Sequence, residues 1–304
     1  MIDGIFNVLK PPGMTSHDVI AFLRRALNTK KVGHGGTLDP DAAGVLPVFT
    51  GTATRLLEFA VEGKKQYLVE VTLGKQTDTG DDSGNVVKEM PVPAFNEEAL
   101  QKVLQGFLGK QKQLPPMYSA IKINGQKLYQ LARKGVEVER ELRDIEVYKL
   151  ELLHFTESTL TLAVDCSKGT YIRVLGEDIA TALGTCGTMS FLLRTQVGSY
   201  TLNASHTLQE IAADPTACVA QPVTAVAHLP KLVLTDNQAA RITNGVRTTV
   251  AGTEEGQYVL MSADEEFLGK QQQHCPHAAE HSNHNGGTLF YRRRFIRPFQ
   301  IREF

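Results

Sequence analysis

Residues 33–47 read GHGGTLDPDAAGVLP, and this stretch determines how the rest of the chain is interpreted. Three glycines precede Asp39, and Pro40 follows it. Glycine lets the backbone approach a ligand closely, and proline fixes the direction in which the chain leaves. Residues 33–40 are too rich in glycine and too poor in periodicity for a helix or strand, so we expect a loop. Asp39 is therefore either a solvated turn residue or a carboxylate presented to a ligand.

Regular elements are expected on both sides of this loop. Upstream, the pattern predicts a strand over residues 4–9 and then a helix capped by Ser16. Downstream it predicts strands over residues 45–50, 67–73, 145–155 and 159–165, helices over 52–59, 96–108, 127–134 and 172–183, and a hairpin at Asn124-Gly125. Strands and helices alternate irregularly, which predicts an α+β fold with a mixed, mainly antiparallel sheet flanked by helices.

The pattern changes near residues 225–231, after which short strand-like runs are separated by polar turns. We place a domain boundary there, between a larger domain over residues 1–230 and a small β-rich domain over residues 231–304. Residues 270–287 have little apolar content, which predicts a long exposed loop. Adventitious metal binding is the alternative, because the segment contains His274, His277, His281 and His284.

Composition restricts the class of protein. With 42% hydrophobic and 21% charged residues among 304, the chain is typical of a soluble globular enzyme. It has no run of about 18 apolar residues and no basic, then apolar, leader, so we expect a cytoplasmic protein that does not contact a membrane. Its four cysteines form no CxxC pair and are expected to be reduced. No Walker loop, GxGxxG or metal-ligand set is present, so we expect neither a cofactor nor a metal.

A net charge of −1 gives no support for a nucleic-acid partner. Basic residues gather locally, however, and each group is either a solvated face or a set of phosphate contacts. These groups are Lys30 and Lys31; Lys64 and Lys65; Lys122, Lys127, Arg133 and Lys134; and Arg292, Arg293, Arg294 and Arg297.

The stretch over residues 33–47 resembles the catalytic loop of the TruB-type pseudouridine synthases, which are related to the dyskerin RNA-guided enzymes. Six further motifs follow the family in order: KPPGMTS (10–16), KQY (65–67), LG with TDT (73–79), PPMYSAIK (115–122), CSKGTYIR (166–173) and LRT with VG (193–198). The resemblance implies the pseudouridine synthase catalytic fold over residues 1–230, followed by a PUA-like RNA-binding domain. Asp41 and Ala43 depart from the family, which usually has an apolar and a small hydroxyl residue there.

The resemblance also implies an activity. Uridine 55 in the T loop of tRNA would be isomerised to pseudouridine, through a flipped-out base and an aspartate-dependent cleavage and re-formation of the glycosidic bond. Asp39 matches the essential carboxylate, which suits a nucleophile or a base. Arg173 matches an arginine that would lower the pKa of Asp39 by ion pairing. Tyr67 matches the tyrosine that stacks on the target base.

Three further residues match the family's substrate-binding positions. His34 matches the histidine that takes the place of the uridine in the stack, and Asp81 matches an acidic residue near the active site. Lys122, with residues 113–134, matches the part that folds over the RNA arm. Leu192 or Leu193 would complete an apolar wall under the base. Without the resemblance, Tyr67 reads as a core residue, Arg173 as a phosphate contact or structural salt bridge, and His34 and Asp81 as turn residues.

Two other functions fit parts of the pattern. A tRNA-binding or folding factor without catalysis would explain the basic groups, but not Asp39, Tyr67 and Arg173 together. A glycosidase would need a second acid across a sugar, and Asp39 has no obvious partner. The stand-alone form is expected over the guide-dependent form, because no long basic extension or docking tail is visible. This predicts a monomer that binds the T stem-loop of tRNA without an obligate protein partner.

Overall fold

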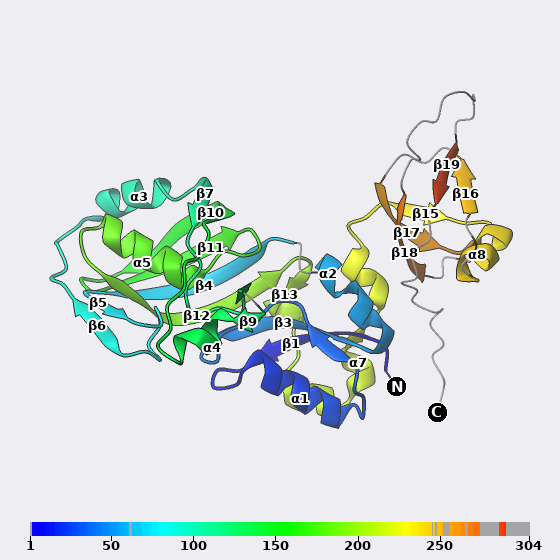
Figure 1. Cartoon of the computed structure of the whole chain (residues 1–304), viewed down its shortest axis with the longest axis horizontal. Coiled ribbons are helices and arrows are strands. Elements are labelled where there is room, and N and C mark those ends of the chain that lie inside the picture. Colours follow the sequence, from blue (N-terminus) through cyan, green and yellow to red (C-terminus); the bar gives the residue numbers. More distant parts are fainter. Residues whose placement is uncertain are drawn as a thin grey trace.

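A ten-stranded sheet is the main feature of the computed structural model, which describes residues 2–60, 63–123, 125–244, 246, 248–251, 256–264, 267–273 and 286–289. Its strands run in the order β14-β1-β3-β12-β4-β11-β10-β7, with β2 paired to β3 and β13 paired to β12 (Figure 1). All described neighbours in this sheet are antiparallel except β3 and β12, which are parallel. The expected α+β fold with a mixed, mainly antiparallel sheet is confirmed.

The strands of this sheet are β1 (Gly4–Lys10), β2 (Val32–His34), β3 (Ala43–Thr50), β4 (Lys65–Leu73), β7 (Gly109–Gln113), β10 (Arg143–Phe155), β11 (Thr159–Cys166), β12 (Gly187–Val197), β13 (Tyr200–Thr201) and β14 (Val219–Ala220). Around it lie η1 (Gly51–Leu56), α2 (Leu57–Ala60), β5 (Lys75–Thr77), β6 (Val86–Glu89), β8 (Lys122–Ile123), β9 (Gln126–Lys127), α4 (Leu128–Ala132), η2 (Leu202–Ala204), α6 (Leu208–Ala213), α7 (Pro215–Cys218) and η3 (Pro222–Val226).

Strands β1 and β3 are covered on both faces, so their sequences are apolar almost throughout. On one face Phe6 packs with Val19 and Leu23 of α1 (Ser16–Ala26). On the other face Ile5 packs with Phe49. Because both of their faces are covered, these two strands provide a rigid support for the connection between β2 and β3, which contains Asp39.

The half of the sheet around β4 is covered on one face only. Burial alternates along β4, and its buried positions include Tyr67 and Val69. These side chains share a core with α3 (Glu97–Gln105) and α5 (Ile172–Ala182), which Figure 1 shows on the same side of the sheet. Arg173 lies in the first turn of α5 and is buried against that face.

Three local expectations were wrong. The N-cap of α1 is Thr15, which forms a capping box with Asp18, while Ser16 is the first residue of the helix. The segment 51–60 is a 3₁₀ helix followed by a single α-helical turn, and the Thr52 hydroxyl donates to Asp3 instead of capping a helix. Within the expected loop over residues 33–40, Gly33 and His34 extend β2, because β3 offers them an edge for pairing.

The C-terminal part contains separate small sheets. Strands β15 (Lys231–Val233), β17 (Gly256–Met261) and β18 (Phe267–Gln273) form one sheet, β16 (Thr248–Ala251) pairs with β19 (Gly286–Leu289), and α8 (Asp236–Thr243) lies between β15 and β16 in the chain. Val259 and Met261 belong to the same buried cluster as Ile5 and Phe49. The domain boundary at residue 230 stays a prediction. The long loop expected over residues 270–287 is wrong at both ends, because β18 runs to Gln273 and β19 begins at Gly286. Residues 274–285, with the four clustered histidines, and 290–304, with the last basic group, lie outside the described residues.

The parallel contact between β3 and β12 requires a glycine. Gly44 pairs with Arg194 and has a φ of +113°, a region that side chains disfavour. A Cβ at Gly44 would lie 2.7 Å from the backbone nitrogen of Arg194 and closer still to its carbonyl oxygen. The two strands can therefore approach each other only because position 44 has no side chain.

We predict that Gly44→Ala destabilises the fold more than Gly109→Ala. Gly109 also has a positive φ, of +87°, but a Cβ there meets nothing within 4 Å. Gly109→Ala should cost about 1–3 kcal/mol of backbone strain, and Gly44→Ala should add about 1–3 kcal/mol for the overlap with β12. Urea unfolding of both variants measures the difference, and equal losses would contradict the close approach.

Candidate active site

The loop that contains Asp39 is tied down by a buried lysine. Lys10 ends β1 with no exposed surface, and its Nζ donates to the carbonyl oxygens of Pro11 (2.9 Å), Pro40 (2.8 Å) and Ala42 (2.6 Å). Two of these acceptors, Pro40 and Ala42, closely follow Asp39 in the sequence. One ammonium group therefore fixes the backbone on the C-terminal side of Asp39.

Helix α1 holds the same loop from another direction. The buried Ser16 hydroxyl accepts a hydrogen bond from the N–H of Leu38 (2.9 Å) and contacts its carbonyl oxygen at 3.1 Å. The N–H of Gly13, just before the helix, donates to the carbonyl oxygen of Pro40 (3.0 Å). Because Leu38 is itself buried in the core, the residue before Asp39 has little freedom to move.

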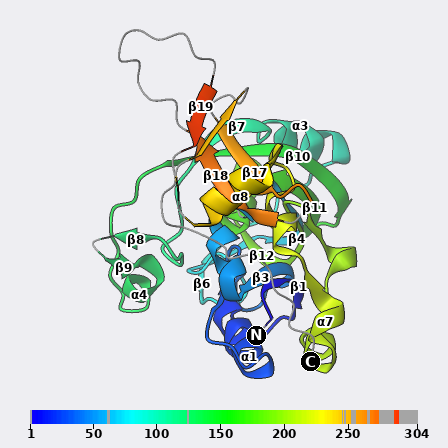
Figure 2. The same cartoon turned by 90° about the vertical axis from the view of Figure 1, so that its right-hand side faces the viewer.

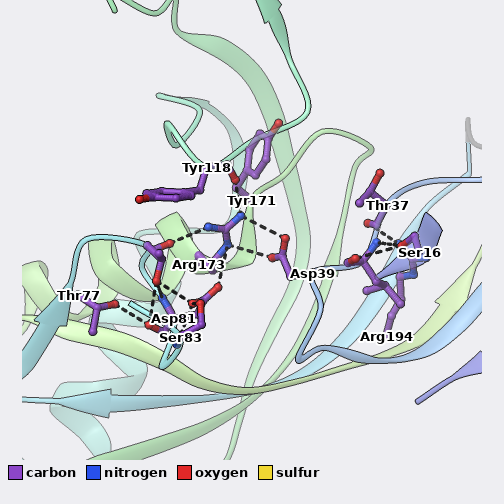
Figure 3. Close-up of polar contacts among 12 residues, drawn as sticks. Ser16, Thr37, Asp39, Thr77, Asp81, Ser83, Tyr118, Tyr171, Arg173 and Arg194 are labelled. Atoms are coloured by element: carbon purple, nitrogen blue, oxygen red, sulfur yellow. Dashed lines mark hydrogen bonds and ion pairs between the residues drawn. The ribbon is translucent and has the colours of Figure 1, made fainter. Parts of the chain in front are cut away.

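Arg194 supports the glycine-rich part of the loop. Its side chain is 1% exposed, and its guanidinium donates to the carbonyl oxygens of Val45 (2.8 Å), Gly36 (3.1 Å) and Thr37 (3.4 Å). All three acceptors are backbone groups, and Figure 3 shows Arg194 below Thr37 and Ser16. The sequence suggested no role for Lys10 or Arg194, and it suggested only helix capping for Ser16. Lys10 and Arg194 are charged residues at strand positions where a buried side chain is expected. This pattern could have revealed them from the sequence.

Arg173 meets Asp39 from α5. Its Nε lies 3.0 Å from Oδ2 of Asp39, and its Nη2 lies 3.4 Å from Oδ1. The other donors go to the carbonyl oxygens of Thr79 (2.6 Å) and Tyr118 (2.7 Å), so the guanidinium joins three segments of the chain (Figure 3). The side chain of Arg173 is 6% exposed, whereas that of Asp39 is 34% exposed. Asp39 therefore keeps one side open to a ligand.

The pKa of Asp39 is raised above its usual value. Burial is the largest cause, the positive charge of Arg173 opposes it, and the negative charge of Asp81 adds to it. Arg173 thus acts in the expected direction but does not outweigh burial. The extra carboxylate of Asp41, which could have raised this pKa, is exposed to solvent; the like charge that acts on Asp39 comes from Asp81.

Asp81 is fixed in the turn between β5 and β6. Its Oδ1 accepts from the hydroxyl of Thr79 (2.7 Å) and the N–H of Ser83 (3.1 Å), and its carbonyl oxygen accepts from the hydroxyl of Thr77 (2.7 Å). Its Oδ2 lies 3.8 Å from Nε of Arg173. The structure therefore places Asp81 in the same charge cluster as Asp39 and Arg173.

Tyr67 is a buried residue of β4 beside this charge cluster. It is the cross-strand partner of Arg194, and its hydroxyl interacts with that guanidinium. Burial raises the pKa of Tyr67 to about 12, so the hydroxyl stays protonated. Leu192 is buried in the same core as Tyr67, whereas Leu193 is half-buried. Leu192 is thus the better candidate for the apolar wall.

His34 and Lys122 lie outside the charge cluster. His34 ends β2 and is half-buried; its Nδ1 is enclosed, with no hydrogen-bond partner among the described residues. Burial and the charge of Arg194 lower its pKa, which favours a neutral ring. Lys122 is exposed on the β8–β9 hairpin, which stands away from the sheet together with α4 in Figure 2. The same segment reaches the cluster through the carbonyl oxygen of Tyr118.

Other kinds of site have little support in the described residues. Among the described residues, no group of three or more His, Cys, Asp or Glu side chains could hold a metal ion. Cys166, Cys186 and Cys218 are buried free thiols, and Cys275 lies outside the described residues. In the part of the chain that the structure describes, no helix is long and apolar enough to cross a membrane.

Comparison with known proteins gives the family. Residues 24–172 match the model of the TruB family pseudouridylate synthase N-terminal domain, and residues 173–226 match that of the tRNA pseudouridylate synthase B C-terminal domain. The chain is 49% identical over 245 residues to tRNA pseudouridine synthase B of Caldanaerobacter subterraneus subsp. tengcongensis, covering 80% of this chain and 85% of the relative. The chain belongs to the TruB family of pseudouridylate synthases. It is therefore an isomerase that forms pseudouridine.

Further relatives agree with this assignment. The tRNA pseudouridine synthase B of Alkaliphilus oremlandii is 44% identical over 276 residues, covering 88% of this chain and 92% of the relative. The crystal structure of a Cbf5-Nop10-Gar1 complex matches with a TM-score of 0.71 and 29% identity, over 89% of this chain and 78% of that one. An H/ACA RNP bound to a substrate RNA containing 2'-deoxyuridine matches with a TM-score of 0.72 and 26% identity, over 99% and 86% of the two chains.

We predict that Ser16→Ala slows pseudouridine formation and costs about 1–3 kcal/mol of stability, because the buried N–H of Leu38 loses its acceptor. The matched control is Ser190→Ala, which removes a hydroxyl hydrogen bond to Glu70 (2.8 Å) that does not involve the loop. Single-turnover rates and urea unfolding compare the two variants. If both reduce the rate equally, the tether to Leu38 does not position Asp39.

We also predict that Asp81→Asn moves the acid side of the rate profile to lower pH. The charge of Asp81 raises the pKa of Asp39. Removing it lowers that pKa, so the ionised carboxylate persists into more acidic solution. Asp82→Asn is the control, because Asp82 is 47% exposed and pairs with Lys75. Rates measured against pH for both variants test the coupling, and an unchanged or higher midpoint for Asp81→Asn would refute it.

Proposed function

We propose that the chain converts uridine 55 in the T loop of tRNA to pseudouridine. The relatives named tRNA pseudouridine synthase B support tRNA as the substrate. The observation that carries the proposal is the partly exposed carboxylate of Asp39. The buried Arg173 holds this carboxylate beside the buried Tyr67. Pseudouridine is an isomer of uridine, so the reaction needs no net oxidation, reduction or group donor. This chemistry fits a site built from side chains alone.

In the proposed mechanism the target base leaves its loop and stacks on Tyr67, with the ribose towards Asp39. Flipping a base out costs a few kcal/mol, which the neutral ring of His34 offsets by filling the vacated stack. The ionised Asp39 acts as nucleophile or base while the glycosidic bond from nitrogen breaks and the bond to carbon 5 forms. Arg173 keeps the carboxylate oriented and favours its charged form. Carbon 5 then loses its proton and the ring nitrogen released from the ribose gains one, so the product is an isomer of uridine.

Recognition of the RNA would involve parts outside this centre. Lys122 stands on the exposed β8–β9 hairpin, where its ammonium group can reach phosphates of the T stem. We assign residues 1–230 to catalysis and residues 231–304 to a PUA-like RNA-binding domain. The chain would act as a monomer in the cytoplasm without an obligate protein partner. The carboxylate of Asp81, 3.8 Å from Nε of Arg173, would help to hold Arg173 in place at the pocket.

The decisive experiment measures tritium release from tRNA labelled at carbon 5 of uridine, with carbodiimide mapping of the modified position. Wild type should release tritium from the T-loop uridine alone, and Asp39→Asn should abolish release while still binding tRNA. Asp41→Asn is the matched control, since Asp41 is exposed two residues away and should keep activity. Tight binding without release by any of the three proteins would instead indicate a tRNA-binding or folding factor.

A further inference from the structure

Three buried cations lie against the loop that contains Asp39. Lys10 and Arg194 are satisfied by backbone carbonyl oxygens, as described above. The third is Lys65, the first residue of β4, which is 8% exposed. A Cβ placed on Gly36 would lie 3.9 Å from Nζ of Lys65 and 3.7 Å from Nη1 of Arg194. The side chain of Lys65 therefore ends beneath the backbone at Gly36.

Lys65 differs from the other two cations because it lacks an acceptor. Among the described residues, no carboxylate or carbonyl oxygen accepts a hydrogen bond from its Nζ. Burial lowers its pKa to about 8, and the positive charge of Arg194 contributes to this shift. Its Nζ is not one of the fully enclosed polar atoms that lack a partner, so the ammonium keeps some contact with solvent. A mostly buried ammonium that has no protein partner and can still be reached from solvent is open to an incoming anion.

The position of Lys65 suggests which anion this is. Lys65 and Tyr67 are two residues apart on β4, so their side chains stand next to each other on the same face of the sheet. Asp39 acts electrostatically on Tyr67 but is not among the charges that act on Lys65. If a nucleotide stacks on Tyr67 with its ribose at Asp39, Lys65 lies on the far side of the tyrosine ring. The ammonium group is then within reach of the sugar-phosphate backbone of that nucleotide. Gly36 places no side chain over Lys65, and its φ of +100° disfavours any other residue at this position.

We propose that Lys65 forms an anion subsite under Gly36 that binds a phosphate next to the target uridine. The inference rests on the proposed function, because it assumes that the target nucleotide stacks on Tyr67. Lys65 is then a positioning residue: it fixes the nucleotide backbone so that the ribose meets Asp39. The exposed basic groups attract RNA from any direction, whereas this buried ammonium accepts one phosphate in one place.

The test uses T stem-loops with a neutral methylphosphonate at the phosphate on the 5' side or the 3' side of the target uridine. Binding is measured with Asp39→Asn protein, the parent, so that no turnover occurs. In this background Lys65→Met should weaken binding of the unmodified stem-loop by about 10- to 100-fold, the effect of one charge-assisted hydrogen bond. With one of the two modified stem-loops, the difference in affinity between the parent and the Lys65→Met variant should vanish, because the missing charge removes the same interaction.

Lys64→Met is the matched control. Lys64 is the adjacent lysine, less buried than Lys65, and its Nζ lies 4.4 Å from the centre of the Tyr148 ring. It should leave the response to either methylphosphonate unchanged. If Lys65→Met binds the unmodified stem-loop as tightly as its parent, or if both methylphosphonates weaken parent and variant equally, the subsite does not exist.

Thermal unfolding separates a binding role from a structural one. Lys65→Met should unfold at the same or a higher temperature, because it removes an unpaired buried charge; a clear loss of stability without coupling to phosphate would make Lys65 a purely structural residue. Lys65→Gln repeats the comparison should the methionine variant fail to fold. Tritium release by protein with Asp39 intact is measured separately. Release without coupling rejects only the subsite, whereas no release rejects the proposed function.

Discussion

The contact between Arg173 and Asp39 is the interaction on which the site depends. It joins an α5 side chain to the loop between β2 and β3, and the same guanidinium binds the turn at Thr79 and the segment at Tyr118. A buried guanidinium needs nearly all of its donors satisfied. If any of these segments shifted, Arg173 would lose a partner and Asp39 would lose its orientation. The Asp39 carboxylate is therefore held by the tertiary fold and not by its own loop alone.

Opposing effects act on the pKa of Asp39, and burial of the carboxylate outweighs the charge of Arg173. Burial and Asp81 raise its pKa, while Arg173 lowers it. A nucleotide that covers the exposed third of the side chain would remove more water and raise the pKa further. The favourable charge of Arg173 then becomes more important in the complex than in the free protein, because electrostatic interactions strengthen where water is excluded. A carboxylate in this balance can change its reactivity when the substrate closes over it.

Much of the fold follows from local patterns in the sequence. The alternation from Tyr67 to Leu73 predicted a strand with one buried face, and Asn96 predicted the start of α3; both are observed. The local pattern predicted the wrong residue where two neighbours could cap the same helix, since Thr15 and not Ser16 caps α1. It also failed at Gly33 and His34, whose strand exists only because β3 lies alongside. Pairing of this kind is a tertiary effect that no local pattern contains.

The candidate site divides in the same way. The resemblance led to Asp39, Arg173 and Asp81, which the structure brings into one charge cluster. It did not reveal the burial of Lys10 and Arg194, because a charged residue is exposed by default and the acceptors here are backbone carbonyl groups distant in the sequence.

The choice of acceptors matters for a protein that handles RNA. A carboxylate partner would have neutralised each buried cation, whereas a carbonyl oxygen satisfies its hydrogen bonds and leaves the positive charge in place. A chain with a net charge of −1 thereby keeps a positive field under its catalytic loop. Because the surrounding protein excludes water there, this field is screened less than that of surface lysines. This is the field in which the proposed phosphate at Lys65 would bind.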